Sequence, residues 1–381
     1  MLEILFLVTA VILAIYALLI LLYRHWFMSL EPFNSEQIAN PITHFSIIIP
    51  ARDEAANIEA CLNSMLKQNY PTQLFEVIVI NDHSTDETES IVKKMQEHFL
   101  NLRLLNLAAH LQDAHNSYKK KAIELAIGQS SGNWIITTDA DCFAKPNWLS
   151  LYDTYIQTSS PVFIAAPVQL RNNGSFLSIF QVLDFMSLQG ITAASVAAGT
   201  HAMCKGANLA YEKKAFYAVG QFSGIDNIAS GDDMLLMQKI KKQYPGKLGF
   251  LFHPDAVVET LPMLAWNEFF QQRIRWASKA VHYQDKSIFW VLLLVYCANF
   301  LLFLMLCMGI YDTNYFYQFF ELLLLKIVAE LLFLYPVSKF FKQTRLLYLF
   351  PIMQPIHICY TVIAGWMGKF GSYQWKGRKV N

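Results

Sequence analysis

Two aspartates, Asp139 and Asp141, directly follow the mostly apolar segment 134–138. In an extended backbone, side chains two residues apart point to the same side, so these carboxylates would converge just beyond the carboxyl end of a strand. Open α/β sheets bind their ligands at that end. Two adjacent carboxylates repel each other unless a cation lies between them, and a hard divalent cation prefers oxygen ligands. The spacing therefore predicts a metal site able to hold a diphosphate; the alternative is a simple turn after the strand, which also favours aspartate.

Short apolar segments alternate with segments of helical periodicity between residues 45 and 138. The predicted strands are 45–50, 75–80, 102–107 and 134–138, and the predicted helices are 57–68, 87–98 and 119–128. Such alternation is typical of an α/β fold with a Rossmann-type, mostly parallel, doubly wound sheet and right-handed crossovers. The strand ends would then bring Asp53, Glu54 and Asp82 to the same edge as the 139–141 pair.

Asp82 and Asp233 are each open to two interpretations. Asp82 follows a predicted buried strand, within reach of a nucleotide base or ribose, but it could equally cap the next helix. Asp233 lies three residues after Ser230, with which it could form a capping box, or it could act as a general base on the first helical turn. The helix N-terminus would lower the pKa of Asp233 and keep it ionised.

A third group of polar residues lies in the amphipathic stretch 271–276, just before a long apolar segment. On a helix, Gln272, Arg275 and Trp276 share one face because they are three and four residues apart. Arg275 could direct a positive charge at a phosphate, and Trp276 could form an aromatic floor for a ligand. The alternative is an interfacial helix whose basic and aromatic residues anchor it beside a membrane.

Hydrophobic residues make up 54% of the 381 residues and charged residues only 15%, and the excess is concentrated in long apolar segments. Segment 4–23 is long enough to span a bilayer, and no small-residue cleavage site follows it. We therefore expect an anchor rather than a removed signal peptide. Segments 287–310 and 319–335 are further candidate spans. Segment 346–367 contains two prolines and could cross the membrane, re-enter it or lie at its interface.

The charge distribution indicates which partners to expect and how the chain is oriented. The net charge of +1 argues against nucleic acid as a partner, because nucleic-acid binding requires a basic surface. Arg24 and His25 follow the first predicted span, so the positive-inside rule places the region after it in the cytoplasm. In the third predicted span, Lys326 and Glu330 are four residues apart, and we expect them to neutralise each other on one helix face.

Five motifs occur in an order and at a spacing that resemble those of the membrane-bound inverting family 2 glycosyltransferases. They are Ile49-Pro-Ala-Arg-Asp-Glu54, Val79-Ile-Asn-Asp-His-Ser-Thr-Asp86, Thr138-Asp-Ala-Asp141, Gly231-Asp-Asp233 and Gln272-Arg-Ile-Arg-Trp276. This group includes cellulose, chitin and hyaluronan synthases and ceramide glucosyltransferases, whose catalytic domains have the GT-A fold. The resemblance implies an N-terminal anchor (1–26), a cytoplasmic catalytic domain (40–285) and a C-terminal membrane region of two or three spans (286–381).

The resemblance also implies a nucleotide site and a divalent metal, Mn2+ or Mg2+. Asp82 would contact the nucleotide base, and Asp141 would be the direct metal ligand, with Asp139 beside it. The other residues implied near the nucleotide are Asp53, Glu54 and either Lys119 or Lys120.

At the acceptor end, Asp233 resembles the catalytic base of the family. Gln272, Arg275 and Trp276 resemble the motif that shapes the acceptor end of the site and steadies the diphosphate. Residues 205–208 resemble the segment that contacts the donor sugar and the acceptor.

The sequence departs from the family pattern at several positions. Asn81 and His83 replace the commoner aspartate and glycine, and Asp53 stands where asparagine is usual. Gly231-Asp-Asp233 is not the threonine-glutamate-aspartate of the polymerising synthases, which weakens the case for a processive enzyme.

The resemblance implies an enzyme that transfers a hexose-type sugar from a nucleotide-sugar donor, with a UDP-sugar expected, to a lipid or glycan acceptor at the membrane. It further implies inversion at the anomeric carbon and an integral protein of the cell's inner or plasma membrane, with its catalytic domain in the cytoplasm. The alternatives are a processive polysaccharide synthase, a nucleotidyltransferase and a non-catalytic membrane scaffold that retains the fold. A nucleotidyltransferase would need an early glycine-rich phosphate loop, and Pro50-Ala-Arg-Asp-Glu54 does not provide one.

Overall fold

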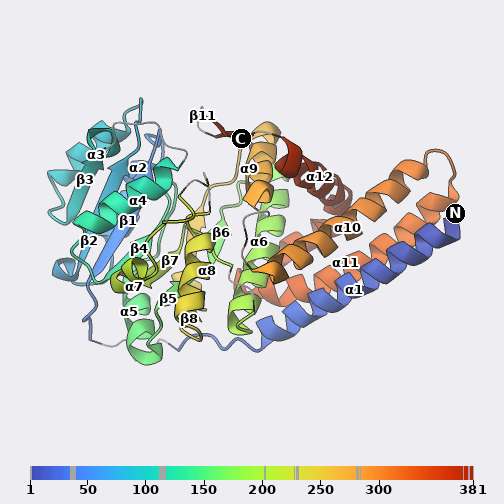
Figure 1. Ribbon diagram of the computed structural model, residues 1–381, viewed down its shortest axis with the longest axis horizontal. Helices are drawn as coiled ribbons and strands as arrows, with labels where there is room; N and C mark the ends of the chain where they lie inside the picture. Colours follow the sequence, from blue (N-terminus) through green and yellow to red (C-terminus); the bar gives the residue numbers. More distant parts are fainter. Residues whose placement is uncertain are drawn as a thin grey trace. The chain divides into compact units, whose positions relative to one another are not determined.

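The computed structural model describes residues 2–34, 40–110, 117–200, 203–226, 228, 231–279, 283, 285–371, 373–375 and 378–380. The chain folds into two compact units, shown in Figure 1. The sheet unit comprises Glu31–Arg171 and Ala202–Leu261, and the helical unit comprises Met1–Leu30, Asn172–His201 and Pro262–Asn381. These compact units do not test the predicted boundaries of the anchor (1–26), the catalytic domain (40–285) and the C-terminal membrane region (286–381), which stay predictions.

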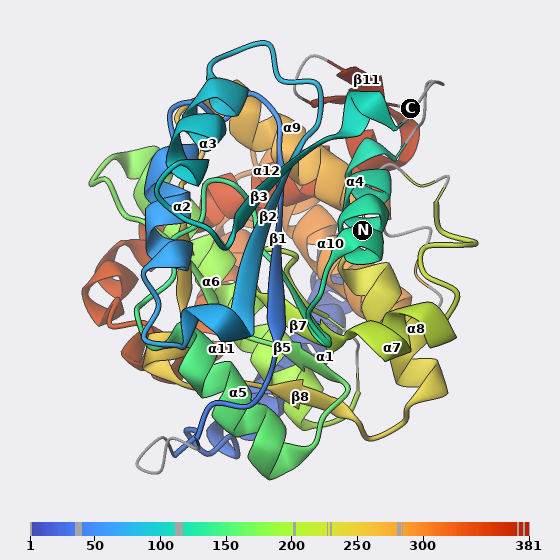
Figure 2. The same ribbon diagram turned by 90° about the vertical axis from the view of Figure 1, so that its left-hand side faces the viewer.

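A seven-stranded, mostly parallel sheet forms the centre of the sheet unit (Figure 2). In spatial order its strands are β3 (Leu102–Asn106), β2 (Phe75–Asn81), β1 (Phe45–Ala51), β4 (Trp134–Thr137), β7 (Leu209–Glu212), β5 (Phe163–Ala165) and β8 (Leu248–Phe250). Among these described strands, only β7 runs antiparallel to its neighbours, β4 and β5. Every residue of β2 is buried, as expected for a parallel strand covered on both faces. The predicted α/β fold with a mostly parallel sheet is confirmed.

Helices cover both faces of this sheet. α2 (Ile58–Leu66) and α3 (Thr88–Gln96) lie on one face and α4 (Tyr118–Gln129) lies on the other (Figure 2), as right-handed crossovers require. All three helices form where the helical periodicity predicted them. The remaining elements of the unit are α5 (Trp148–Ser159), α7 (Lys213–Ala218), α8 (Met234–Gln243), the parallel pair β6 (Val168–Leu170) and β9 (Val258–Thr260), and the 3-10 helices Thr72–Leu74, Leu107–Ala109 and Pro254–Ala256.

The register of the three central strands brings their carboxyl ends to one edge. The last residue of β1, Ala51, is paired with Asn81, the last residue of β2. The backbone amide of Asp82 continues this pairing by donating to the carbonyl of Ala51 at 2.8 Å. On the other side of β1, the amide of Thr138 donates to Ile48 at 3.2 Å. The polar residues that follow β1, β2 and β4 therefore start from the same edge of the sheet.

The described residues of the helical unit form six α-helices, a 3-10 helix and a short hairpin. The helices are α1 (Leu2–Met28), α6 (Phe176–Ala197), α9 (Trp266–Ala277), α10 (Lys286–Met308), α11 (Asn314–Phe340) and α12 (Phe350–Phe370), and the hairpin strands are β10 (Tyr373–Trp375) and β11 (Arg378–Val380). α1 packs against α6, α10 and α11, and α12 packs against α9 and α10. Figure 1 shows α1, α10 and α11 as long neighbouring rods. The 3-10 helix Thr344–Leu349 leads into α12.

Among the described residues of this unit, four helices are long and apolar enough to cross a membrane: Glu3–Met28, Phe176–Ala197, Lys286–Met308 and Thr344–Phe370. Three of them overlap the predicted segments 4–23, 287–310 and 346–367. The predicted span 319–335 lies in α11, which is not among the four because Glu321, Lys326 and Glu330 lower its hydropathy. α6 is among the four but was not predicted; it carries a single charged residue and is mostly buried within its unit. The predicted pairing of Lys326 with Glu330 is confirmed, at 2.8 Å.

Candidate active site

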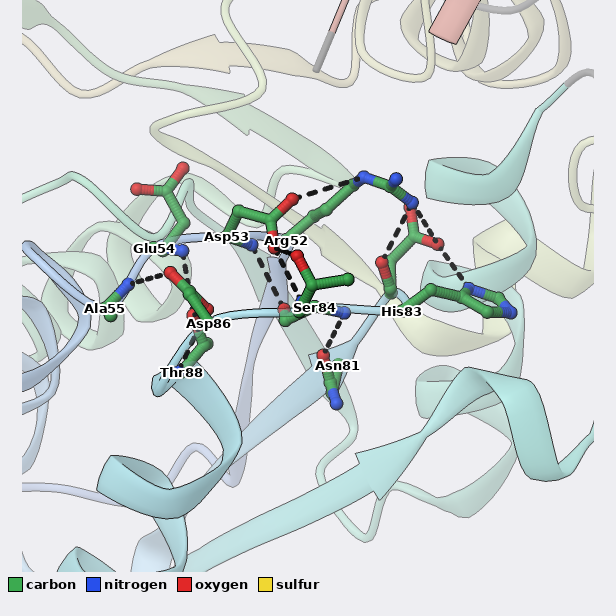
Figure 3. A network of polar contacts seen from close by, with 11 residues as sticks. Arg52, Asp53, Glu54, Ala55, Asn81, His83, Ser84, Asp86 and Thr88 are labelled. Carbon is green, nitrogen blue, oxygen red and sulfur yellow. Dashed lines mark hydrogen bonds and ion pairs between the residues drawn. The ribbon is translucent and has the colours of Figure 1, made fainter. Parts of the chain in front are cut away.

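The loops after β1 and β2 are joined by hydrogen bonds, as Figure 3 shows. The backbone amide of Thr85 donates to the Asp53 carboxylate at 2.7 Å, and the amide of Asp53 donates to Ser84 Oγ at 3.1 Å. Asp53 and His83 both have a positive φ, of 51° and 56°. Asparagine and glycine adopt this left-handed conformation more readily than most residues. This explains why the related family commonly has asparagine and glycine at these two positions.

Asp82 is buried, and its carboxylate lies beside the side chains of Arg52 and His83. One of its carboxylate oxygens lies 2.9 Å from His83 Nδ1 and 3.9 Å from Arg52 Nη1. The capping bond to Thr88 at the start of α3 comes instead from Asp86, which accepts at 3.0 Å. Because α3 begins only at Thr88, Asp82 is not its N-cap.

Asp139 and Asp141 converge after β4, as their spacing predicted. Oxygens of both carboxylates and the sulfur of Cys142 lie within 4.8 Å of one another. The pKa of the Asp141 carboxyl is raised to about 6, first by burial and then by the negative charges of Asp139 and Glu54. A hydrogen bond of 2.9 Å from Thr260 Oγ1 holds the other side of Asp141 and partly opposes this shift.

The donor set at this site fits a hard divalent cation. Two carboxylates that repel each other are relieved when a cation binds between them, and Mg2+ and Mn2+ prefer oxygen ligands. The Cys142 thiol is fully buried, and burial raises its pKa, so it stays protonated and is a poor ligand for such a cation. Asp139 and Asp141 are therefore the residues that could hold the metal.

Lys119 on α4 connects this carboxylate pair to a second acidic site. Its Nζ lies 2.9 Å from Asp139 and 3.2 Å from Asp232, which immediately precedes Asp233. Burial alone would lower the pKa of Lys119, but Asp139, Asp232 and Asp233 together raise it above its ordinary value. The lysine is therefore charged and lies between the two acidic sites.

Two backbone amides fix the Asp233 carboxylate at the start of α8. Its Oδ1 accepts from Met234 at 2.7 Å, and its Oδ2 accepts from Gly206 at 3.0 Å. Asp233 is thus itself the N-cap of α8, whereas the capping box predicted with Ser230 involves a residue outside those described. A base role stays compatible with this N-cap position, because each carboxylate oxygen has a second lone pair. A Cβ at Gly206 would lie 3.5 Å from Asp232 and 3.6 Å from Lys119, so glycine leaves this space open.

Two other residues of the predicted site segments, Lys120 and Asn208, make buried structural contacts instead. Lys120 is buried, and its Nζ donates to the backbone carbonyls of Ile225, at 2.8 Å, and Ile228. Of the two lysines expected near the nucleotide, Lys119 is the one that contacts Asp139 and Asp232. Asn208, in the segment that resembles a donor-sugar contact, is also buried, and it bonds to Trp148, Tyr152 and two backbone carbonyls.

The remaining predicted residues belong to the helical unit. Gln272, Arg275 and Trp276 lie on α9 and are partly exposed, whereas Arg273 between them is buried. The structure therefore gathers Asp53, Glu54, Asp82, Lys119, Asp139, Asp141 and Asp233 in the sheet unit, and it places the α9 motif in the other unit. The sequence did not single out Arg52 beside Asp82 or Thr260 beside Asp141. Asp232, which the resemblance implied only as the acidic neighbour of Asp233, contacts Lys119.

Comparison with family models gives two overlapping matches. The model described as Glycosyl transferase family 2 matches residues 46–218. The model described as Glycosyl transferase family group 2 matches residues 134–366, which is more than half of the chain. The first match covers β1 to β4 and their acidic loops, and the second includes both the Asp139–Asp141 pair and the α9 motif.

Individual relatives resemble parts of the chain. Glycosyltransferase AglE of Haloferax volcanii is 35% identical over 105 residues, which are 27% of this chain and 32% of that protein. Poly-beta-1,6-N-acetyl-D-glucosamine synthase of Staphylococcus epidermidis is 22% identical over 262 residues, which are 66% of this chain and 59% of the synthase. The matched part of this chain thus covers less than two thirds of the length of each relative.

One solved structure matches nearly the whole chain. It is mannosyltransferase PcManGT from Pyrobaculum calidifontis in complex with GDP-Man and Mn2+. The TM-score is 0.61, and the alignment covers 97% of this chain and 99% of that chain. Because the two sequences are only 16% identical, this likeness concerns the fold.

Proposed function

This chain belongs to the family 2 glycosyltransferases, and we propose that it transfers a sugar, with inversion, from a nucleotide-sugar donor to a lipid or other membrane-associated acceptor. The observation that carries this proposal is the arrangement around Lys119 in the sheet unit. Its ammonium group lies between Asp139, beside the metal-type carboxylate Asp141, and Asp232, beside the fixed carboxylate of Asp233. Donor diphosphate chemistry and acceptor deprotonation can therefore occur next to each other.

The donor end is proposed to be formed by the loops after β1, β2 and β4. The buried carboxylate of Asp82 is oriented by Arg52 and His83, and such a carboxylate can accept a hydrogen bond from a nucleotide base. At the same edge, the Asp53 carboxylate accepts a hydrogen bond from the loop after β2, and the backbone amide of Glu54 donates to Thr88 at the start of α3. Lys119 supplies positive charge for the phosphates, as lysine often does in phosphate sites.

A divalent cation held by Asp139 and Asp141 would stabilise the negative charge that develops on the leaving diphosphate. The convergence of the two carboxylates and the raised pKa of Asp141 support this assignment. Mn2+ is the first ion to test, because the PcManGT complex contains it.

Asp233 is proposed to act as the general base. Its carboxylate accepts the proton of the acceptor hydroxyl, while the hydroxyl oxygen forms a bond to the anomeric carbon of the sugar. The bond between that carbon and the diphosphate oxygen breaks, and its electron pair leaves with the nucleoside diphosphate. Because the new bond forms on the face opposite the leaving group, the configuration inverts. The two amide bonds to Asp233 keep its carboxylate in a fixed orientation.

The helical unit supports a membrane location and hence a membrane-associated acceptor. α1 and α10 expose many large apolar side chains, and hydrocarbon is the environment that such helices require. The exposed residues on these two helices are Ile4, Leu7, Val8, Val11, Ile15, Leu18, Leu21, Leu22, Met28, Phe289, Trp290, Leu292, Leu293 and Phe300. Arg24 and His25 near the C-terminal end of α1 favour a cytoplasmic catalytic region. The α9 motif, proposed to shape the acceptor end, directly precedes α10 in the chain.

Mass spectrometry of lipids tests this proposal. The chain and its Asp233→Asn variant are expressed in a host that lacks the gene, and the lipid extracts are compared. A glycolipid gained only with the unsubstituted chain supports single-sugar transfer. Polymer without glycolipid would instead support a processive synthase, which the similarity to the Staphylococcus epidermidis synthase makes the second candidate. If neither product forms and purified protein does not hydrolyse UDP-GlcNAc or GDP-mannose, the scaffold alternative holds.

A further inference from the structure

Arg273 lies inside the α9 motif but points away from its partly exposed face. Its side chain is only 4% exposed, whereas Gln272 and Trp276 on either side are partly exposed. Its guanidinium nitrogen Nη2 lies 2.6 Å from Asp184 on α6, whose side chain is also 4% exposed. Removing either partner of such a buried ion pair strongly destabilises the folded protein, because the other charge is then left unpaired in an apolar environment.

The same guanidinium contacts two of the three motif residues. Nη1 donates to Gln272 Oε1 at 2.7 Å, and the guanidinium carbon lies 4.2 Å from the centre of the Trp276 ring. The edge of the planar guanidinium group therefore bonds to Gln272, and the group lies over the ring of Trp276. Lysine could keep the charge but could not make both contacts, because its ammonium group is a point charge without a flat face.

The other end of the ion pair is held by a third helix. Tyr360 on α12 donates a hydrogen bond to Asp184 Oδ1, and His357, one turn earlier on α12, lies 3.9 Å from the same oxygen. The Trp276 ring also lies 6.3 Å from the Phe185 ring on α6. α6, α9 and α12 are thus connected through one buried cluster whose centre is Arg273.

We propose that Arg273 and Asp184 are positioning residues that hold the Gln272 and Trp276 side chains in the conformation that receives the acceptor. This inference rests on the proposed function for the role of Gln272 and Trp276. The arginine does not itself contact substrate in this account. It acts by restricting the side chains beside it, and displacements of about 1 Å in such residues can cost two orders of magnitude in rate.

A matched control lies in the same unit. Lys326 and Glu330 form a second buried ion pair on α11, at 2.8 Å, and Gln354 bonds to both of them. Tyr16 on α1 also donates to Glu330. Among the residues that the structure describes, the side chains bonded to this pair lie on α1, α11 and α12 and not on α9. A Glu330→Gln substitution therefore perturbs a buried polar cluster of the same unit without touching the motif.

The test compares Arg273→Lys, Asp184→Asn and Glu330→Gln in membranes of the expressing cells, with UDP-[14C]GlcNAc and GDP-[14C]mannose as donors. For each variant, label in solvent-extractable product is divided by label released as free sugar. We expect Arg273→Lys and Asp184→Asn to lower this ratio at least about tenfold and to leave UDP affinity unchanged. Glu330→Gln should lower the midpoint of thermal unfolding but leave the ratio at the wild-type value. An unchanged ratio in Arg273→Lys, or an equal loss in Glu330→Gln, would overturn the inference.

A second measurement does not depend on catalysis. Protein labelled with 5-fluorotryptophan gives a 19F resonance for Trp276, which is assigned by its loss in Trp276→Phe. We expect Arg273→Lys to shift or broaden this resonance and Glu330→Gln to leave it unchanged. If the wild-type protein uses neither donor, the proposed function fails, whereas an unchanged Trp276 resonance in Arg273→Lys refutes the positioning role by itself.

Discussion

The ammonium nitrogen of Lys119 lies 2.9 Å from a carboxylate oxygen of Asp139. Because the same nitrogen also contacts Asp232, a single lysine joins the acidic site after β4 to the acidic site that begins α8. A diphosphate that binds at the first site is then adjacent to Asp233, the proposed base. Because each of these residues has a different proposed role, substituting each of them should have a different effect.

Asp141→Ala should weaken metal-dependent nucleotide binding. Removing the carboxylate that carries the raised pKa removes one of the two proposed oxygen ligands, and loss of a metal-site group commonly costs about 10–100-fold in metal affinity or activity. Titration calorimetry of UDP with and without Mn2+ measures the effect. Cys142→Ala is the control, because a buried, protonated thiol is not expected to bind the cation. Equal Mn2+ dependence in Asp141→Ala and wild type would contradict the metal assignment.

The adjacent lysines should give opposite results. Lys119→Met should abolish sugar transfer with little effect on stability, since it removes a charge from between aspartates that water can still reach in part. Lys120→Met should instead lower the free energy of unfolding by about 2 kcal/mol, because it leaves two buried backbone carbonyls without their charged donor. Denaturant unfolding and transfer assays on both variants check this. A destabilised Lys119→Met and a stable, inactive Lys120→Met would reverse our assignment.

Substitutions at Gly206 should show a size threshold. An added Cβ would be at ordinary contact distance from Asp232, Asp233 and Lys119, so Gly206→Ala is expected to retain measurable transfer. Gly206→Leu would place a larger apolar side chain between the lysine and the carboxylates, and we expect transfer to fall at least about a hundredfold. Circular dichroism establishes that both variants are folded. Full activity in the leucine variant would show that this space is not used.

The left-handed backbone of Asp53 predicts a residue-type effect. Asp53→Asn should keep stability and donor binding, since asparagine tolerates positive φ and can still accept the 2.7 Å bond from Thr85. Asp53→Val removes the acceptor and places a β-branched residue in a disfavoured conformation, at a cost of about 1–3 kcal/mol. Thermal unfolding of the two variants distinguishes these outcomes. Similar midpoints for both would show that neither the backbone conformation nor the bond to Thr85 contributes.

The parts of the fold that depend on local pattern were predictable from the sequence. The apolar runs of β1, β2 and β4 defined the strands, and the spacing of Asp139 and Asp141 defined their convergence. The parts that depend on long-range packing were not predictable. Thr260 reaches Asp141 from a strand far along the chain, with no local signal. Lys119 and Lys120 point in directions about 100° apart on α4, but only the packing of the helix decides which of them faces the aspartates.

The long apolar helices also include some that the local sequence predicted and one that it did not. α1 and α10 were predicted because their apolar composition is continuous. α6 was not predicted as a long apolar helix, because Asp184 and several small and polar residues interrupt its apolar sequence. The i,i+4 pair Lys326–Glu330 was predicted from spacing alone, whereas the pair Arg273–Asp184 joins two helices and required the structure.

The most direct test of the account is single-turnover sugar transfer by Asp233→Asn in membranes. Asparagine can still cap α8, so the variant should fold and bind UDP with wild-type affinity. Because it cannot accept the acceptor proton, we expect transfer of labelled sugar to fall by about 10²–10⁴-fold. Unchanged UDP binding together with lost transfer is the result that the account predicts. Transfer within about twofold of wild type, at equal protein and donor concentrations, would contradict the assignment of Asp233 as the base.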